Sequence, residues 1–149
     1  MSTELYCGFL SKNLLTQPAP TTLRSPLRPA RGRHLVDSGC VFVGHGLTTD
    51  FRIINLFVPP SQVKDTVELY RLPGQRKISL RFLSAFLLRK GIQGDTHDSV
   101  EDARIALLLY RKYLELEKQG KNALSKTIHA IYECGRMTKW KSAHGITVS

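Results

Sequence analysis

The stretch CVFVGHGLTTDFRIINL, residues 40–56, decides the fold. Its first half, residues 40–43, is a short apolar run that stops at Gly44, which is typical of a buried strand in a parallel sheet. Its second half starts with the threonine pair 48–49, which is suited to cap a helix expected over residues 50–56. A buried strand that leads directly into a helix indicates an α/β fold.

Downstream of this stretch, the pattern predicts one more strand and three helices. Residues 63–69 (VKDTVEL) alternate well enough for a second strand, and Ser79 is placed to cap an amphipathic helix. The longest helix is expected over residues 99–118, and a further one over 123–134 before a basic tail with Trp140. The apolar face of the longest helix is expected to be Ala103, Ala106, Leu107, Tyr110, Tyr113 and Leu114.

Upstream, residues 1–35 differ from the rest because prolines and arginines dominate them. Two interpretations stay open: a flexible extension, which is the commoner case, and a basic arm for nucleic acid. We expect order to begin near Val36. The predicted division is an extension over 1–35, a partial domain over 36–120, and a C-terminal helix with a basic tail over 121–149.

Composition narrows the class of protein. The 149 residues are 42% hydrophobic and 23% charged, which suits one globular domain and is too apolar for wholesale disorder. No apolar run approaches the roughly 20 residues of a membrane-spanning helix. The three cysteines match neither a disulfide framework nor a zinc site, so a reducing compartment is expected. The net charge of +10 favours a polyanionic partner, although a basic protein without one fits equally well.

Three residues next to expected helix starts stand out as chemically useful. Asp50 follows the buried strand, whereas His97 precedes the longest helix and Asp102 lies in its first turn. A single Asp at a helix start is more often structural, because the helix dipole stabilises it. Together, however, two carboxylates and a histidine fit a site for Mg²⁺ or Mn²⁺ in which a neutral His acts as a base.

These residues lie in blocks that resemble a known family. VFVGHGLTTDFRIIN, VKDTVEL, KISLRFLSAFLL and IQGDTHDSVEDARIALLLYRKYLEL look like the exonuclease domain of the DEDD superfamily, histidine subtype. The resemblance implies a ribonuclease H-like fold and 3′-to-5′ hydrolysis of phosphodiesters with two divalent ions. It also implies that Asp50 and Asp102 are metal ligands from the second and third motifs and that His97 is the general base.

Within this family, the blocks are most similar to the catalytic subunits of poly(A) nuclease deadenylation complexes. That similarity implies poly(A) tails of mRNA as the substrate and a cytoplasmic location, in processing bodies among other places. The implied partners are a regulatory subunit and the protein bound to poly(A), with no membrane.

The chain departs from the family at the first motif, an Asp-x-Glu pair on the central strand. None of the six Asp residues is followed two positions later by Glu. We therefore expect the C-terminal portion of an exonuclease domain, with the motif-bearing strands missing, an unpaired sheet edge and impaired activity. The alternative is a non-catalytic remnant that binds RNA or a deadenylation partner.

Other polar residues have plainer interpretations. Asp65 is expected to make strand-edge hydrogen bonds rather than bind metal, and His45 is either structural or near substrate. Asp98 and Glu101 are expected to cap the longest helix. The basic residues Arg76, Lys77 and Arg81 form either a solvated face or contacts to RNA phosphates. The pair His97–Asp98 also occurs in helical metal-dependent phosphohydrolases, but the strands argue against that fold.

Overall fold

The computed structural model describes residues 6–10, 13–16, 29–89 and 99–141. Its centre is a four-stranded sheet in the order β2-β1-β3-β4. The strands are β1 (Tyr6–Leu10), β2 (Asn13–Thr16), β3 (Val41–Gly44) and β4 (Val63–Asp65). β3 is parallel to both of its neighbours, β1 and β4, whereas β2 runs antiparallel to β1. An α/β fold with parallel strands is therefore confirmed.

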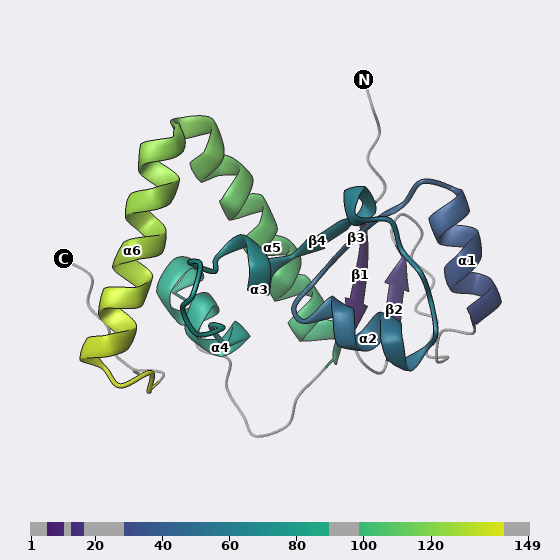
Figure 1. Cartoon of the computed structure of the whole chain (residues 1–149), viewed down its shortest axis with the longest axis horizontal. Coiled ribbons are helices and arrows are strands. Elements are labelled where there is room, and N and C mark those ends of the chain that lie inside the picture. Colours follow the sequence, from purple (N-terminus) through teal and green to yellow (C-terminus); the bar gives the residue numbers. More distant parts are fainter. Residues whose placement is uncertain (1–5, 11–12, 17–28, 90–98, 142–149) are drawn as a thin grey trace.

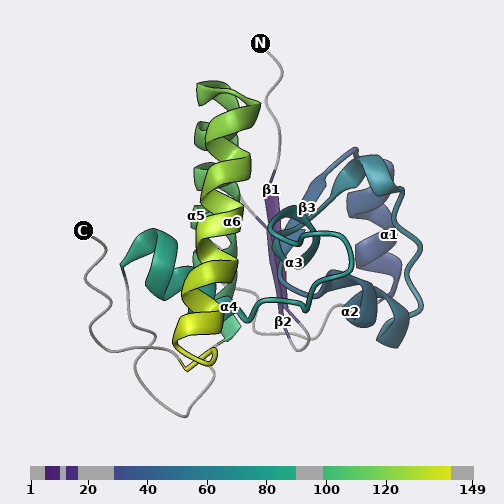
Figure 2. The same ribbon diagram turned by 60° about the vertical axis from the view of Figure 1, so that its left-hand side comes forward.

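Helices cover both faces of the sheet (Figures 1 and 2). On one side lie α1 (Pro29–Asp37) and α2 (Leu47–Ile53), and on the other lies α5 (Ser99–Gln119) with α6 (Lys121–Met137) packed against it. Successive strand residues point to opposite faces. Phe42 accordingly joins the core beneath α2, where its ring meets Phe51 edge-on at 5.4 Å. The sheet thus has a packed layer on each face, as buried parallel strands require.

The N-terminal segment differs from its predicted role. Ordered elements were expected from about Val36, yet β1 and β2 precede that residue and α1 begins before it, at Pro29. Pro29 is the first residue of α1, a position where the missing N–H costs nothing and the fixed φ suits a helix. The expected unpaired edge beside β3 is wrong too, because β1 pairs with β3 from Tyr6↔Val41 to Phe9↔Gly44.

The segment 63–69 is also not the single strand that was predicted. The strand ends at Asp65, and α3 (Thr66–Leu69) follows at once. The Asp65 side chain accepts a hydrogen bond from the Val67 N–H, and this capping contact starts the helix. The alternation of residues 63–69 did not reveal the switch from strand to helix, because Asp65 is both the last residue of β4 and the N-cap of α3.

The helical predictions agree better with the structure. Ser79 caps α4 (Leu80–Leu83) by accepting from the Phe82 N–H at 3.2 Å, and a π-helical turn over Ser84–Leu88 continues it. Within α5, the predicted face is largely buried, but a second face is buried as well. Ile105 and Leu109 on that second face pack with Tyr132 of α6 and Phe82 of α4 in one cluster. α5 is therefore the central helix of the molecule, with the sheet on one side and α4 and α6 on the other.

A candidate active site at the carboxyl ends of β1 and β3

The turn between β3 and α2 is shaped by glycine. Gly46 is the N-cap of α2 and has φ of +82°, a left-handed conformation that glycine adopts without strain. The predicted cap by the threonine pair 48–49 is wrong, because both residues lie inside α2. The exposed amides of the helix instead find a distant acceptor in Asp65, at the end of the neighbouring strand.

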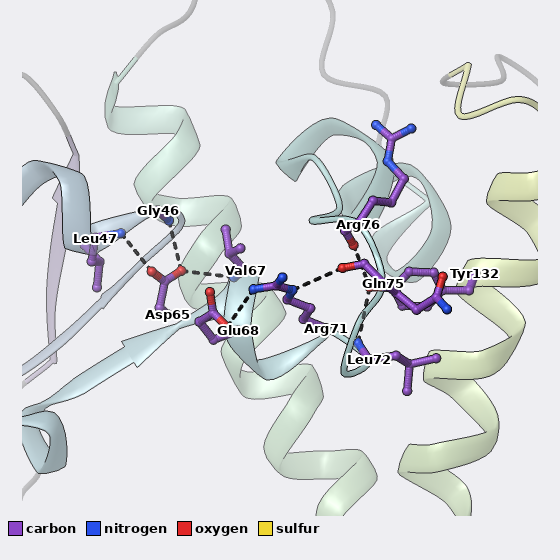
Figure 3. A network of polar contacts seen from close by, with 10 residues as sticks. All are labelled: Gly46, Leu47, Asp65, Val67, Glu68, Arg71, Leu72, Gln75, Arg76 and Tyr132. Carbon is purple, nitrogen blue, oxygen red and sulfur yellow. Dashed lines mark hydrogen bonds and ion pairs between the residues drawn. The ribbon is translucent and has the colours of Figure 1, made fainter.

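Asp65 ties three backbone amides together (Figure 3). Its Oδ1 accepts from the N–H of Gly46 at 2.9 Å and of Val67 at 3.0 Å, and its Oδ2 accepts from Leu47 at 2.8 Å. One carboxylate thus joins the start of α2 to the start of α3. The predicted hydrogen-bonding role of Asp65 is confirmed, and these bonds link two helix starts in addition to ending the strand. Hydrogen bonds to a charged acceptor are about twice as strong as neutral ones.

His45 belongs to the same structural network. Its Nδ1 lies 2.8 Å from the Thr66 hydroxyl, which donates its proton to the Gly44 carbonyl at 3.1 Å. Burial lowers the pKa of His45, and the nearby Asp65 carboxylate only partly opposes this effect. Of the two interpretations left open, the structure favours the structural histidine.

Asp50 is the most perturbed carboxyl of the site. It lies in the first turn of α2 and is only 6% exposed. Burial raises the pKa of Asp50 to about 6, and the adjacent negative charge of Asp65 adds to the effect. A buried carboxylate next to another carboxylate is costly to ionise unless a cation accompanies it. The surroundings of Asp50 therefore suit a metal ligand.

The second predicted ligand, Asp102, lies half-buried in the first turn of α5. In Figure 1 this end of α5 lies beside the end of β1, at the edge of the sheet from which the chain enters α2. His97 and Asp98 lie outside the described residues. Among the residues that are described, no group of three His, Cys, Asp or Glu side chains is arranged to hold a metal ion.

The reason for this incomplete donor set is the sequence of β1. β1 occupies an interior place in the sheet, between β2 and β3, and its residues are YCGFL. The resemblance puts the family's Asp-x-Glu pair on the central strand, but this strand carries no carboxylate. The sequence alone indicated that the central strand is missing. The structure instead has a strand at that place, but this strand lacks the two carboxylate ligands of the family's first motif.

A groove of about 590 Å³ adjoins the Asp65 network between α2 and α3. Its walls include Phe51, Leu56, Phe57 and Leu69, together with the carboxylates of Asp65 and Glu68. Arg52 lines the groove as well, so its charged residues are of both signs. No sequence pattern indicated this groove, because its walls come from three separate segments. No described helix is long and apolar enough to cross a membrane.

Comparison with known proteins agrees with this geometry. The model of the exonuclease family RNase_T matches residues 27–110, which include β3, α2, β4 and the first half of α5. The chain belongs to the exonuclease family. The predicted resemblance and the ribonuclease H-like fold are thus confirmed for this exonuclease chain.

Curated relatives of this exonuclease chain are catalytic subunits of the PAN2-PAN3 deadenylation complex. The human protein is 55% identical over 123 residues, which are 81% of this chain and 10% of the relative. The protein of Cryptococcus neoformans is 46% identical over 139 residues, covering 91% of this chain and 12% of the relative. The chain therefore spans about a tenth of the length of the curated relatives it matches.

Solved structures show the same likeness. The Pan2 pseudoubiquitin hydrolase–RNA exonuclease module of Saccharomyces cerevisiae with A7 RNA has a TM-score of 0.69 and 46% identity, over 74% of this chain and 18% of that one. The Pan2 catalytic unit of Neurospora crassa has a TM-score of 0.65 and 43% identity, over 76% and 19%. At these identities the shared exonuclease fold is secure.

Proposed function

We propose that this chain carries part of the active site of a 3′-to-5′ exoribonuclease that degrades poly(A), and that by itself it is a poor enzyme. In this proposal Asp50 and Asp102 are metal ligands, and His97 is the general base that accepts a proton from the attacking water. The observation that carries the proposal is the buried Asp50 at the carboxyl end of β3, beside an interior strand that has no carboxylate.

The cofactors of the proposal are two divalent ions, Mg²⁺ or Mn²⁺. When bound, such ions stabilise the attacking and leaving oxygens of an in-line displacement. The residues of this chain position the side chains that would hold these ions. Asp65 fixes the start of α2 and thereby the position of Asp50, and the packing of α5 on the sheet fixes Asp102.

The partners in this proposal follow the names of the relatives. The names of the relatives support a PAN3-type regulatory subunit and mRNA 3′ tails as partners, and the proposal adds a poly(A)-binding protein. It also includes a cytoplasmic location, which the absence of a disulfide pattern in the sequence supports.

The test is magnesium-dependent degradation of 5′-labelled oligo(A) by the purified chain. We expect little or no shortening from the 3′ end, because two of four carboxylate ligands are missing. As matched variants, Asp50→Ala removes a proposed ligand and Asp37→Ala removes an exposed carboxylate at the end of α1. Efficient cleavage that only Asp50→Ala abolishes would show that the site is complete and would overturn the predicted impairment.

The residue roles are tested in a longer chain that supplies the Asp-x-Glu pair. There, His97→Ala is expected to abolish turnover while sparing Mn²⁺ binding, measured by calorimetry. Retained turnover would contradict the role of His97 as the base. Loss of Mn²⁺ binding in Asp50→Ala but not in His97→Ala would separate ligand from base.

A second candidate function is a non-catalytic domain that binds RNA or a deadenylation partner. The observation that favours it is again the carboxylate-free β1. RNA binding that weakens with salt, without metal-dependent cleavage, would select it.

A further inference from the structure

A cationic surface lies where α4 meets the C-terminal end of α6, a part of the molecule that the proposed site does not use. Figures 1 and 2 both show α4 beside that end of α6. Tyr132 joins α6 to the loop that precedes α4: its hydroxyl accepts from the Leu72 N–H at 3.2 Å and donates to the Arg76 carbonyl at 2.8 Å (Figure 3).

Trp140 adds the second connection. After α6 the chain turns back through Lys139 and Trp140, which have φ of +52° and +58°. The Trp140 N–H donates to the Gly135 carbonyl at 2.8 Å, and the indole packs on Phe82 and Tyr132 at 5.2 and 5.6 Å between ring centroids. The guanidinium of Arg76 lies over the indole, 4.6 Å from the ring centroid. Segments 60 residues apart are thus held together by aromatic packing.

These segments bring together an unusual set of charges. Residues 72–89 and 134–141 contain no Asp or Glu at all. We define the α4/α6 basic surface as the exposed cations of these segments that lie next to the aromatic contacts: Arg76, Lys77, Arg81, Arg136, Lys139 and Lys141. Within the described part of the chain, no ion pair neutralises any of these six.

We propose that the α4/α6 basic surface binds the phosphate backbone of single-stranded RNA, away from the catalytic edge of the sheet. Six like charges repel one another, so the compact arrangement carries an electrostatic cost that a polyanion removes. Stacking of Arg76 on Trp140 fixes one guanidinium in place and leaves its N–H groups available for phosphate oxygens. The choice of RNA over other polyanions rests on the proposed function, whereas the binding itself needs neither metal nor catalysis.

The test measures binding of a fluorescent single-stranded RNA to the whole chain in EDTA, over a range of salt concentrations. The variant Lys77→Gln/Arg81→Gln/Arg136→Gln removes half of the cations of the surface and spares Arg76 and Trp140, which stack on each other. We expect affinity to fall about tenfold or more at low salt, and the slope of log K against log salt to lose about 2, as loss of three phosphate contacts predicts.

The matched control is Lys118→Gln/Lys121→Gln/Lys126→Gln. These cations are also exposed, and they lie at the opposite end of α6 or next to it on α5. The control loses the same net charge, so we expect it to keep nearly the full affinity and salt slope. Circular dichroism shows whether either variant has unfolded, and the single variant Arg136→Glu provides a second test at a solvent-facing position.

The possible outcomes are distinct. Selective loss in the α4/α6 variant supports the proposal. Equal loss in both variants would show that only net charge matters and would overturn the proposal. Absence of RNA binding by the parent chain would overturn it as well. Binding to phosphatidylserine vesicles that depends on this surface, with RNA binding unchanged, would assign the surface to membranes instead. Because EDTA excludes hydrolysis, none of these results decides whether the chain is a nuclease.

Discussion

At the scale of single residues, Asp65 is the polar side chain on which the site depends most. It is buried and accepts from three amides that would otherwise lack partners at two helix starts. We expect Asp65→Ala to reduce the free energy of unfolding by about 2–4 kcal/mol, since a bond to a charged group contributes roughly 1.5–3 kcal/mol and the three bonds, which share one carboxylate, do not add fully. Urea denaturation measures this. Glu68→Ala, in the exposed part of the adjacent helix, is the control and should cost less than about 0.5 kcal/mol.

Asp50 predicts a pH dependence of stability. Its pKa is about 6 in the folded chain but near the ordinary 3.8 when unfolded, so the folded state binds the proton more tightly. The stabilisation by this proton is complete below pH 3.8 and is lost as pH rises through 6, by about 3 kcal/mol in total. Urea titrations in EDTA between pH 4 and 8 measure the loss.

The variant Asp50→Asn should be free of this contribution, so that its stability relative to the parent chain increases with pH. Asp37→Asn, at an exposed position, is the control and should follow the parent curve. If the stability of the parent chain and of the Asp50→Asn variant depended on pH in the same way, the Asp50 carboxyl would have the same pKa in the folded and the unfolded chain. The prediction concerns the metal-free chain only.

At the scale of elements, the end of α6 depends on a close approach between Gly135 and Trp140. A Cβ at position 135 would overlap the indole ring. In a helix interior, Ala normally stabilises a protein by about 1 kcal/mol relative to Gly. A destabilising Gly135→Ala substitution would therefore reveal the contact with Trp140. We expect Gly135→Ala to destabilise the chain by about 1–3 kcal/mol through overpacking.

The same substitution should change sign when the ring is removed. In a Trp140→Ala background, Gly135→Ala is expected to stabilise by about 0.5–1 kcal/mol, because only helix propensity remains. Thermal or urea unfolding of the four chains gives this double-mutant cycle. A destabilisation of equal size in both backgrounds would show that something other than Trp140 limits the space at Gly135.

The sequence predicted elements well wherever one local rule governed them. Ser79 caps α4 as its pattern indicated, and β3 is the buried strand that its apolar run predicted. Prediction failed where a partner distant in sequence decided the outcome. α2 starts at Leu47 and not at the threonine pair because Asp65, 18 residues away, supplies the acceptor.

The candidate site shows the same division. Asp50 was found because it follows a strand in a helix start, and burial confirms that its position is unusual. Its raised pKa was not foreseeable, because burial is the main cause and the charge of Asp65, which lies at the end of β4, adds to it. The identity of the interior strand was also missed, since YCGFL is too short and too close to a proline-rich segment to be recognised as part of the sheet.

At the scale of the whole molecule, β1 and β2 decide whether β3 is an interior strand or an exposed edge. β1 supplies the parallel partner of β3 along Tyr6–Phe9, and β2 in turn covers β1. Deletion of residues 1–16 removes both strands and leaves the apolar β3 with unpaired N–H and C=O groups. Such an edge pairs readily with another chain.

We therefore expect the chain that lacks residues 1–16 to lose cooperative thermal unfolding and to associate. Circular dichroism melting and light scattering measure the two effects, and deletion of residues 142–149 is the control. Retention of a sharp monomeric transition after deletion of residues 1–16 would mean that β1 contributes little to the sheet. The strand order β2-β1-β3-β4 would then not describe the stable part of the molecule, and β3, which leads into the helix of Asp50, would be a sheet edge where a carboxylate-bearing strand from elsewhere has room to pair.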